Sequence, residues 1–505
     1  MKNERIINSF KNVSIATFLH ISYILISFVV RTIFIKQLST DYLSLNGLFT
    51  NVIALLSFAE LGIGNAITYS LYEPLVKKNE KEIIGLMCFY KKAYRYIRIV
   101  ILTLGIGITF ILPFFISGVN ITINYNFIYW LFLLNTYCTY LFSYKKTLLI
   151  ADQKSYIVLI VEKVFFGIQS IIQCIVLIYF HNYILFLIIQ VVSTLIGNII
   201  VTLYVNNKYK YLKNNENIFL SKIKKDDIFT NIKSICLYKI GAVILNGTDN
   251  LLISRLIATF YVGLYSNYSM IVNAINGLLM QACNSLVGTI GQYNVEHSGK
   301  DGKRVFSELF LISFWIFGVS SVCMAVLFNS FIQLWIGEKY MLDCNIVIVI
   351  VLAFYITGIN QIPSLYRTSY GIFKQARVLP IIAAFINIVL SIVLGKKMGL
   401  VGIFLATVIA KEITFNIFDP YIVFKKGFNL SPNKFFIEKI RYLLLLILNY
   451  CICLTIYKFL DFSGWIGFFF KCTIIFIISN LLFLVFLYKN ENFNNIFKRL
   501  IGKVR

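Results

Sequence analysis

Repeated apolar blocks, most of them long enough to cross a lipid bilayer, restrict the possible folds of this chain more than any other feature. A spanning helix needs roughly 20 mostly apolar residues. Backbone groups in lipid must be hydrogen-bonded within their own segment, so these blocks must form helices. We therefore predict an all-α polytopic membrane protein with about 14 transmembrane helices. The predicted spans are 12–35, 42–66, 96–118, 123–143, 155–180, 183–206, 234–257, 262–289, 306–329, 344–366, 377–395, 399–424, 440–459 and 464–488.

Lysine and arginine are concentrated in the segments between the blocks. With a cytoplasmic N-terminus, 36 of the 47 basic residues fall in predicted cytoplasmic segments, and only six fall in predicted external loops. This bias satisfies the positive-inside rule and predicts that both termini are cytoplasmic. The exception is Lys396-Lys397, on the predicted external side. The formal charge of +25 is thus explained by topology and by attraction to acidic membrane lipids, and nucleic acid is not an expected partner.

Two parts of the chain resemble each other at a spacing of about 220 residues. Tyr144-Lys145 matches Tyr366-Arg367, and Gln153 matches Gln375 at the same offset. The implied unit is six spans, so the two copies share one orientation, as in transporters with parallel repeats. We predict two pseudo-symmetric six-helix lobes and a two-helix C-terminal appendage. The expected parts are the N-lobe at 1–206, a basic cytoplasmic linker at 207–233, the C-lobe at 234–424, and spans 13 and 14 with a basic tail at 425–505.

Polar side chains recur at helical spacing in the first two spans of each predicted lobe. Charged or amide groups are costly in lipid, so they usually face a cavity or a partner helix. We predict that these stripes face a central substrate cavity. The predicted cavity residues are His20, Ser27, Arg31, Asn46, Glu60, Lys239, Asn246, Asp249, Asn250, Asn273 and Asn276. For the serine and asparagine members, hydrogen bonding between helices without transport is the alternative.

Two further sites contain adjacent opposite charges within spans. Glu162-Lys163 and Lys411-Glu412 are either local pairs or are divided between neighbouring helices, and the sequence leaves both arrangements open. An ionisable group within a span is a functional hypothesis by default.

Enzymatic and cofactor-binding signatures do not stand out. The ten cysteines show no metal-ligand spacing, so we expect neither a metal nor another cofactor. No loop is long enough for a catalytic domain of at least about 50 residues, which argues against an enzyme. Gly62-Ile63-Gly64 lacks the strand context of a nucleotide site and is predicted to permit close helix packing.

The segment from Ser57 to Ala66 (SFAELGIGNA), followed by SLYEPL at 70–75, resembles the polysaccharide-transporter family of oligosaccharide-lipid flippases. This family belongs to the multidrug/oligosaccharidyl-lipid/polysaccharide exporter superfamily. The loop ADQK at 151–154 and Tyr366-Arg367 followed by GIFK at 371–374 are also similar to this family. The resemblance covers nearly the whole chain in span number, repeat and loop lengths.

The resemblance implies a multi-pass protein of the bacterial plasma membrane that moves a polyprenyl-pyrophosphate-linked oligosaccharide unit to the external leaflet for surface polysaccharide assembly. A polysaccharide polymerase or glycosyltransferases would be further partners. In superfamily members the first two spans of each lobe form the cavity. Arg31 and Lys239 would then attract the pyrophosphate, and Glu60 and Asp249 are candidates to take up a coupling cation or proton.

Three other functions are weighed against this one. A cation-coupled multidrug exporter and a peptidoglycan-precursor flippase have the same fold and remain open. A membrane-embedded glycan polymerase or ligase would need a large external loop with clustered bases. The largest predicted external loop, near 330–343, contains only Lys339 as a base, which disfavours that class.

Overall fold

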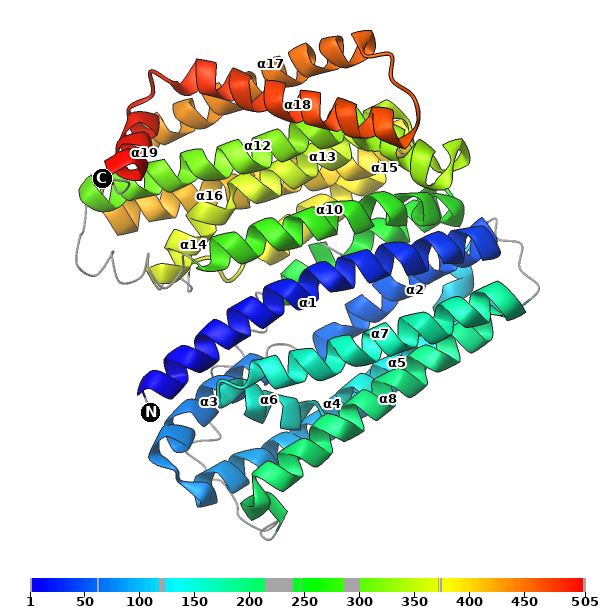
Figure 1. Cartoon of the computed structure of the whole chain (residues 1–505). Coiled ribbons are helices and arrows are strands. Elements are labelled where there is room, and N and C mark those ends of the chain that lie inside the picture. The colour runs from blue at the N-terminus through cyan, green and yellow to red at the C-terminus, as the bar shows by residue number, and fades with distance from the viewer. Residues whose placement is uncertain are drawn as a thin grey trace. The chain divides into compact units, whose positions relative to one another are not determined.

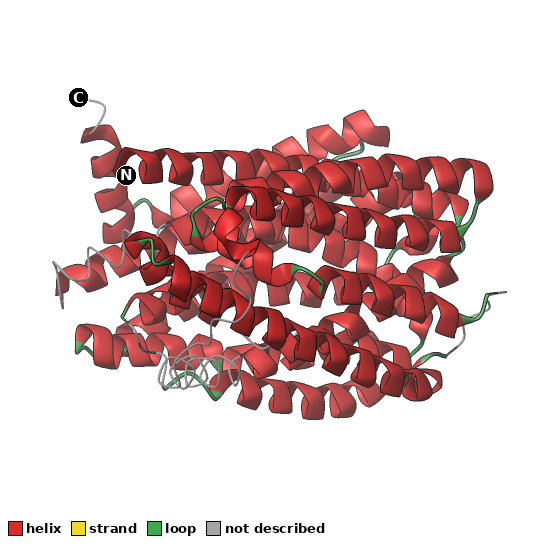
Figure 2. Ribbon diagram, turned by 90° about the horizontal axis from the view of Figure 1, so that it is seen from below, coloured by secondary structure: helices red, strands yellow, loops and turns green. Residues whose placement is uncertain are grey.

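The structure is a computed structural model that describes residues 2–60, 63–117, 123–213, 239–245, 247–285, 300–370, 372 and 375–502. Every regular element in these ranges is a helix (Figure 2). Nine helical stretches of the described chain are long and apolar enough to cross a membrane. The predicted all-α polytopic class is confirmed.

Two compact units divide the chain, Met1–Gly263 and Leu264–Arg505. The first unit includes the predicted seventh span as well as the first six. The predicted boundaries of the lobes remain predictions, because most of the linker at 207–233 lies outside the described residues.

Long antiparallel helices form the first unit (Figure 1). α1 packs along α7, α7 along α8, and α8 along α5. Asn79 and Asn182 cap α4 and α8 by accepting hydrogen bonds from the N–H groups of Glu82 and Leu185. The elements are α1 (Lys2–Gln37), α2 (Thr40–Leu56), the 3₁₀ helix η1 (Ser57–Glu60), α3 (Ile63–Lys77), α4 (Glu80–Phe115), α5 (Tyr125–Tyr140), α6 (Ser143–Ala151), α7 (Ser155–Phe180), α8 (Tyr183–Lys208), η2 (Lys210–Lys213) and helical residues 239–245 and 247–256.

The second unit surrounds α12, which packs against α13, α17 and α18. An aromatic core joins these helices, and the ring of Phe314 stacks on that of Tyr442 with centroids 4.3 Å apart. The elements are α10 (Thr259–Ser285, which crosses the unit boundary), α12 (Lys300–Ile336), η3 (Glu338–Tyr340), α13 (Cys344–Ile359), α14 (Gln361–Ser369), α15 (Leu379–Ile413), α16 (Phe415–Ile422), the π-helix η4 (Val423–Phe428), α17 (Asn433–Phe459), α18 (Gly464–Leu487) and α19 (Glu491–Gly502).

The predicted internal repeat is visible in the helix boundaries. α5 and α13 each have 16 residues, and α6 and α14 each have nine. The pairs α2 and α10, α5 and α13, and α6 and α14 begin at residues 40 and 259, 125 and 344, and 143 and 361. These starts differ by 219, 219 and 218 residues, so the two halves of the chain repeat one order of helices.

Equivalent turns of the two repeats contain a left-handed residue. His181, between α7 and α8, has φ of 47°, and Gly399, 218 residues later, has φ of 61°. Gly399 interrupts α15 between the two predicted spans 377–395 and 399–424. The two residues differ in ψ, which is 31° at His181 and −137° at Gly399, and only glycine adopts the second conformation without a steric cost.

The second predicted span is not one helix. α2 ends at Leu56 and the 3₁₀ helix η1 follows, so the span predicted over 42–66 is not one continuous α-helix. The hydroxyl of Ser57 donates back to the carbonyl oxygen of Ile53 over 3.1 Å, a bond that commonly bends a helix. The broken part of the span contains Glu60, one of the predicted cavity residues.

Candidate functional site

The polar stripe of α1 lies partly within the first unit. The ammonium group of Lys163 on α7 is 3.6 Å from the ring centroid of Tyr23, which lies between His20 and Ser27 on α1. His20 Nε2 and Ser27 Oγ are buried and have no hydrogen-bond partner among the described residues. Buried polar atoms usually have partners, so these two atoms mark a face able to accept a polar ligand or water.

Arg31 and Asn46, predicted from two different spans, both lie near Tyr183. Asn46 Nδ2 donates to the phenol oxygen of Tyr183 over 3.1 Å. Arg31 interacts electrostatically with the same phenol. Tyr183 is only 1% exposed, and its ring packs against Phe34 and Tyr42. Tyr183 is not among the predicted site residues, because one tyrosine at the start of a span is not distinctive.

Glu60 faces the interior of the first unit. Its Oε1 accepts a hydrogen bond from the Tyr94 hydroxyl over 3.0 Å, and the Tyr94 ring stacks on Tyr140 with centroids 6.4 Å apart. A methyl group on Gly64 would lie 3.0 Å from Glu60 Oε1. The glycine thus allows a close approach by a carboxylate, besides the close helix packing that the sequence predicted.

Part of the predicted seventh span packs on α2. A methyl group on Gly247 would lie 2.7 Å from Cδ2 of Leu55, so the backbones of these two helices approach closely. Lys239 and Asp249 are half-buried on this helix. Asn250 is 8% exposed, and its Oδ1 has no hydrogen-bond partner within the described chain.

The other predicted asparagines divide into three cases. Asn246 lies outside the described residues. Asn273 is exposed on α10. On the same helix, the Oδ1 atom of Asn276 is buried without a hydrogen-bond partner in the part of the chain that the structure describes. Whether these groups share one cavity remains a prediction.

A hydrogen-bonded cluster of hydroxyl residues joins the end of α4 to the turn before α10. Ser117 Oγ donates to the Ser254 carbonyl oxygen over 2.9 Å, and the Ser117 N–H donates to Thr259 Oγ1 over 2.9 Å. Ser254 Oγ donates to the carbonyl oxygen of Phe115 over 2.6 Å. Ser254 and Thr259 are fully buried. The cluster connects residues of both repeats at the predicted external end, and sequence reasoning missed it because isolated hydroxyls carry no periodic signal.

The adjacent opposite charges are divided between neighbouring helices. Glu162 Oε1 is 2.6 Å from Lys146 Nζ on α6, while Lys163 contacts Tyr23 on α1. In the second unit, Glu412 pairs with Lys439 on α17. Lys411 donates to Thr357 Oγ1 on α13 over 3.2 Å. The four charges therefore tie helices together within each unit.

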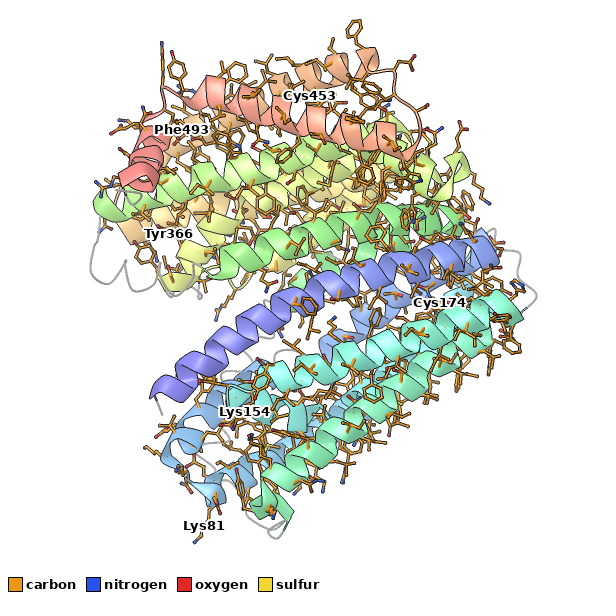
Figure 3. The ribbon with its side chains drawn as sticks, in the orientation of Figure 1. Lys81, Lys154, Cys174, Tyr366, Cys453 and Phe493 are labelled. Atoms are coloured by element: carbon orange, nitrogen blue, oxygen red, sulfur yellow. The ribbon has the colours of Figure 1, made fainter. Side chains whose placement is uncertain are left out.

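The bases that marked the repeat have related positions. Lys145 on α6 donates to Asn206 Oδ1 on α8 over 2.8 Å. Arg367 on α14 lies 3.2 Å from Asp419 on α16, and the sequence did not reveal this partner. Tyr366, labelled in Figure 3, precedes Arg367 and is fully buried.

Lys154, also labelled in Figure 3, is outside the spans and pairs with Asp152. Tyr209 donates to the same carboxylate over 2.6 Å. Burial, followed by the bond to Asp152, raises the pKa of the Tyr209 phenol well above its usual range. The ADQK loop is thus held against the end of α8.

Among the described residues, no group of three or more histidine, cysteine or acidic side chains can hold a metal ion. The nine described cysteines are free thiols.

The sequence matches no family model and no curated protein. Solved structures share its fold. The inward closed conformation of the lipid II flippase MurJ superposes with a TM-score of 0.65 at 18% identity, over 98% of this chain and 99% of that one. An inward-facing multidrug resistance MATE family transporter of the MOP superfamily gives a TM-score of 0.60 at 13% identity, over 79% of this chain and 96% of that one.

A mutant of the Vibrio cholerae MATE transporter VcmN gives a TM-score of 0.54 at 12% identity, over 81% of this chain and 95% of that one. The fold that the sequence resemblance implied, that of the exporter superfamily, is confirmed. These neighbours are transporters, and identities this low establish the fold alone.

Proposed function

We propose that the chain is a flippase that moves a polyprenyl-pyrophosphate-linked oligosaccharide unit from the cytoplasmic to the external leaflet by alternating access. The observation that carries this proposal is the extent of the likeness to the lipid II flippase, which covers 98% of this chain. That match extends over α17 and α18, whereas the two MATE transporters cover 79% and 81%. A lipid-linked substrate is therefore favoured over a drug.

Arg31 and Lys239 supply positive charge for the pyrophosphate. A guanidinium group binds phosphate through paired, charge-assisted hydrogen bonds, which are roughly twice as strong as neutral ones. Arg31 already lies beside the hydrogen-bonded pair Asn46 and Tyr183, which hold its surroundings in one arrangement. The buried amide oxygens of Asn250 and Asn276 are suited to accept hydrogen bonds from sugar hydroxyls.

Glu60 and Asp249 are the coupling groups in this proposal. The carboxylate of Glu60 lies in a helix break and accepts a hydrogen bond from Tyr94. A proton or cation arriving at Glu60 would weaken this bond and change how η1 packs on α4. The hydroxyl cluster of Ser117, Ser254 and Thr259 would then have to open for release at the external end.

The test uses proteoliposomes that contain a fluorescent polyprenyl-pyrophosphate-linked glycan, with a membrane-impermeant quencher reporting external exposure. Arg31→Gln should slow the exposure at least tenfold, because the loss of a charged hydrogen bond costs about 1.5–3 kcal/mol. Lys36→Gln is the matched control, since Lys36 is an exposed base on the same helix. Unchanged exposure in Arg31→Gln at an equal protein level would remove Arg31 from the mechanism.

A peptidoglycan-precursor flippase is the second candidate, because the likeness to MurJ favours it equally. Expression in cells depleted of their lipid II flippase and in cells lacking a surface-polysaccharide flippase separates the two. Rescue of the first strain alone would assign the peptidoglycan precursor. Rescue of drug-sensitive cells alone would assign the multidrug exporter.

A further inference from the structure

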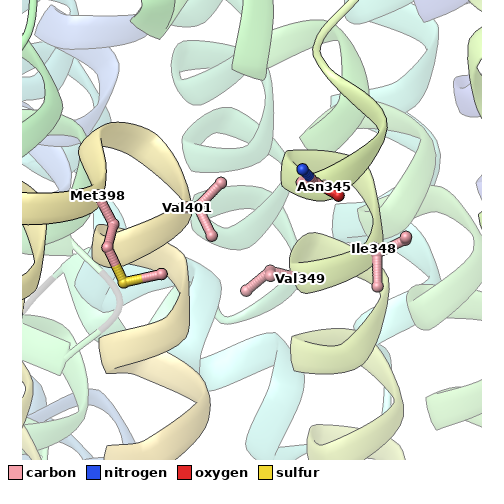
Figure 4. A pocket seen from close by; sticks show the side chains of 5 residues that line it. All are labelled: Asn345, Ile348, Val349, Met398 and Val401. Atoms are coloured by element: carbon pink, nitrogen blue, oxygen red, sulfur yellow. The ribbon is translucent and has the colours of Figure 1, made fainter.

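A pocket opens on the second unit between the start of α13 and the turn within α15. Its volume is about 410 Å³, within the roughly 300–1,000 Å³ of small-molecule sites. Asn345, Ile348 and Val349 line it from α13, and Met398 and Val401 line it from α15 (Figure 4). The left-handed Gly399 separates the two α15 residues and directs the chain around the pocket.

The lining suits a lipid chain. Four of its five side chains are apolar, and Ile348 and Met398 are 36% and 48% exposed. Asn345, in the first turn of α13, is the polar member and provides amide donors at one edge. Both helices begin or turn here, so the pocket lies where spans meet the membrane surface. An apolar surface with a polar edge at that level matches a phospholipid, which has an acyl chain beside a headgroup.

The charge beside the pocket is positive. Lys396 and Lys397 directly precede Met398 and are both exposed. Neither forms an ion pair with any described residue. Glu338, Lys339 and Asp343 precede α13, so three bases stand against two acids in these segments. Lys396 and Lys397 are also the exception to the positive-inside pattern, so we expect their charge to bind a group at this site.

We propose that this pocket binds an anionic phospholipid of the external leaflet. One acyl chain lies over Ile348, Val349, Met398 and Val401, and the headgroup phosphate binds at Lys396 and Lys397. The site goes beyond the proposed transport function, because none of its residues belongs to the polar stripes. It makes the second unit a receptor for a structural lipid.

The experiment measures quenching of Val401→Trp by chain-brominated lipids in vesicles, against a background protein that contains only its four native tryptophans. Brominated phosphatidylglycerol should quench the new tryptophan at a much lower mole fraction than brominated phosphatidylcholine. Each lysine contributes roughly fivefold to this preference, so Lys396→Gln/Lys397→Gln should reduce it roughly 25-fold.

Two controls match the design. Lys425→Gln/Lys426→Gln removes another exposed lysine pair, at the predicted cytoplasmic side, and should leave the preference intact. Phe385→Trp places the probe at an exposed apolar position of α15, about three turns before Lys396, and should report no headgroup preference. Equal quenching by both lipids at residue 401, or a preference that survives loss of Lys396 and Lys397, would overturn the proposal.

A second measurement needs no tryptophan in the pocket. Native mass spectrometry of the parent protein should detect retained phosphatidylglycerol, and the Lys396→Gln/Lys397→Gln protein should have lost it. Equal retention in both proteins would also contradict the site. Neither readout depends on transport, so failure of the flippase proposal and failure of this one are distinguishable.

Discussion

Removal of Asp419 tests whether a buried ion pair holds α14 against α16. Arg367 Nε lies 3.2 Å from Asp419 Oδ1, and the two side chains are 6% and 0% exposed. The other carboxylate oxygen accepts a hydrogen bond from Asn360 over 3.0 Å. Water could not supply the lost charge, so Asp419→Ala would leave a buried guanidinium group without its counter-charge.

The expected cost follows from this burial. Breaking a buried pair by removing one partner costs about 3–5 kcal/mol in the free energy of unfolding. Replacing both partners with apolar side chains of similar volume is often neutral or stabilising by about 1–4 kcal/mol. Asp419→Ala should therefore be strongly destabilising, and Arg367→Met/Asp419→Leu should recover most or all of the loss.

The assay is reversible unfolding in mixed micelles at increasing denaturing detergent, followed by tryptophan fluorescence. Glu73→Ala is the matched control, because Glu73 and Lys77 form an ion pair whose side chains are 71% and 68% exposed and which contributes little. An Asp419→Ala protein no less stable than Glu73→Ala would contradict a stabilising role for the buried pair. A double variant as unstable as Asp419→Ala would contradict it as well.

Three further predictions use the same unfolding assay or a thermal melt. Gly358→Ala should destabilise the second unit by about 1–3 kcal/mol, because its methyl group would lie 2.1 Å from the Phe317 ring; a wild-type midpoint would contradict this. Tyr183→Phe removes the hydrogen bond from Asn46 and should cost about 0.6 kcal/mol, while glycan exposure should slow if Tyr183 positions Arg31. Burial, and then a nearby lysine, lowers the pKa of Lys145, so the unfolded chain keeps its proton to higher pH than the folded one and stability should rise with pH up to the ordinary lysine pKa. Lys145→Met should lack this alkaline gain in melting temperature, and an identical pH profile in both proteins would refute the assignment.

The fold was largely predictable because its signals are local. Apolar length predicts helical spans, and the matches at Tyr144 and Tyr366 predict a repeat that the helix starts reproduce. The orientation that loop charge predicts stays a prediction. The break in the second predicted span has a cause that average hydropathy does not register. The Ser57 hydroxyl donates to the helix backbone, and Tyr94 donates to the Glu60 carboxylate.

The candidate site was less predictable because partners belong to segments distant in the chain. Nothing near Arg367 indicates Asp419, 52 residues later, and nothing near Asn46 indicates Tyr183. Helical periodicity identifies which residues share a face but not which helix that face meets. For the same reason the sequence left the arrangement of Glu162-Lys163 and Lys411-Glu412 open.

The division of those charges has a consequence for biosynthesis. Glu162 on α7 pairs with Lys146 on α6, and α6 is synthesised before α7. Glu412 instead pairs with Lys439, which is translated later, in the first helix of the two-span appendage. The carboxylate of Glu412 is therefore synthesised before the lysine with which it pairs. A nascent chain that stops before α17 would leave that carboxylate uncompensated, which makes the appendage part of the assembly of the second repeat.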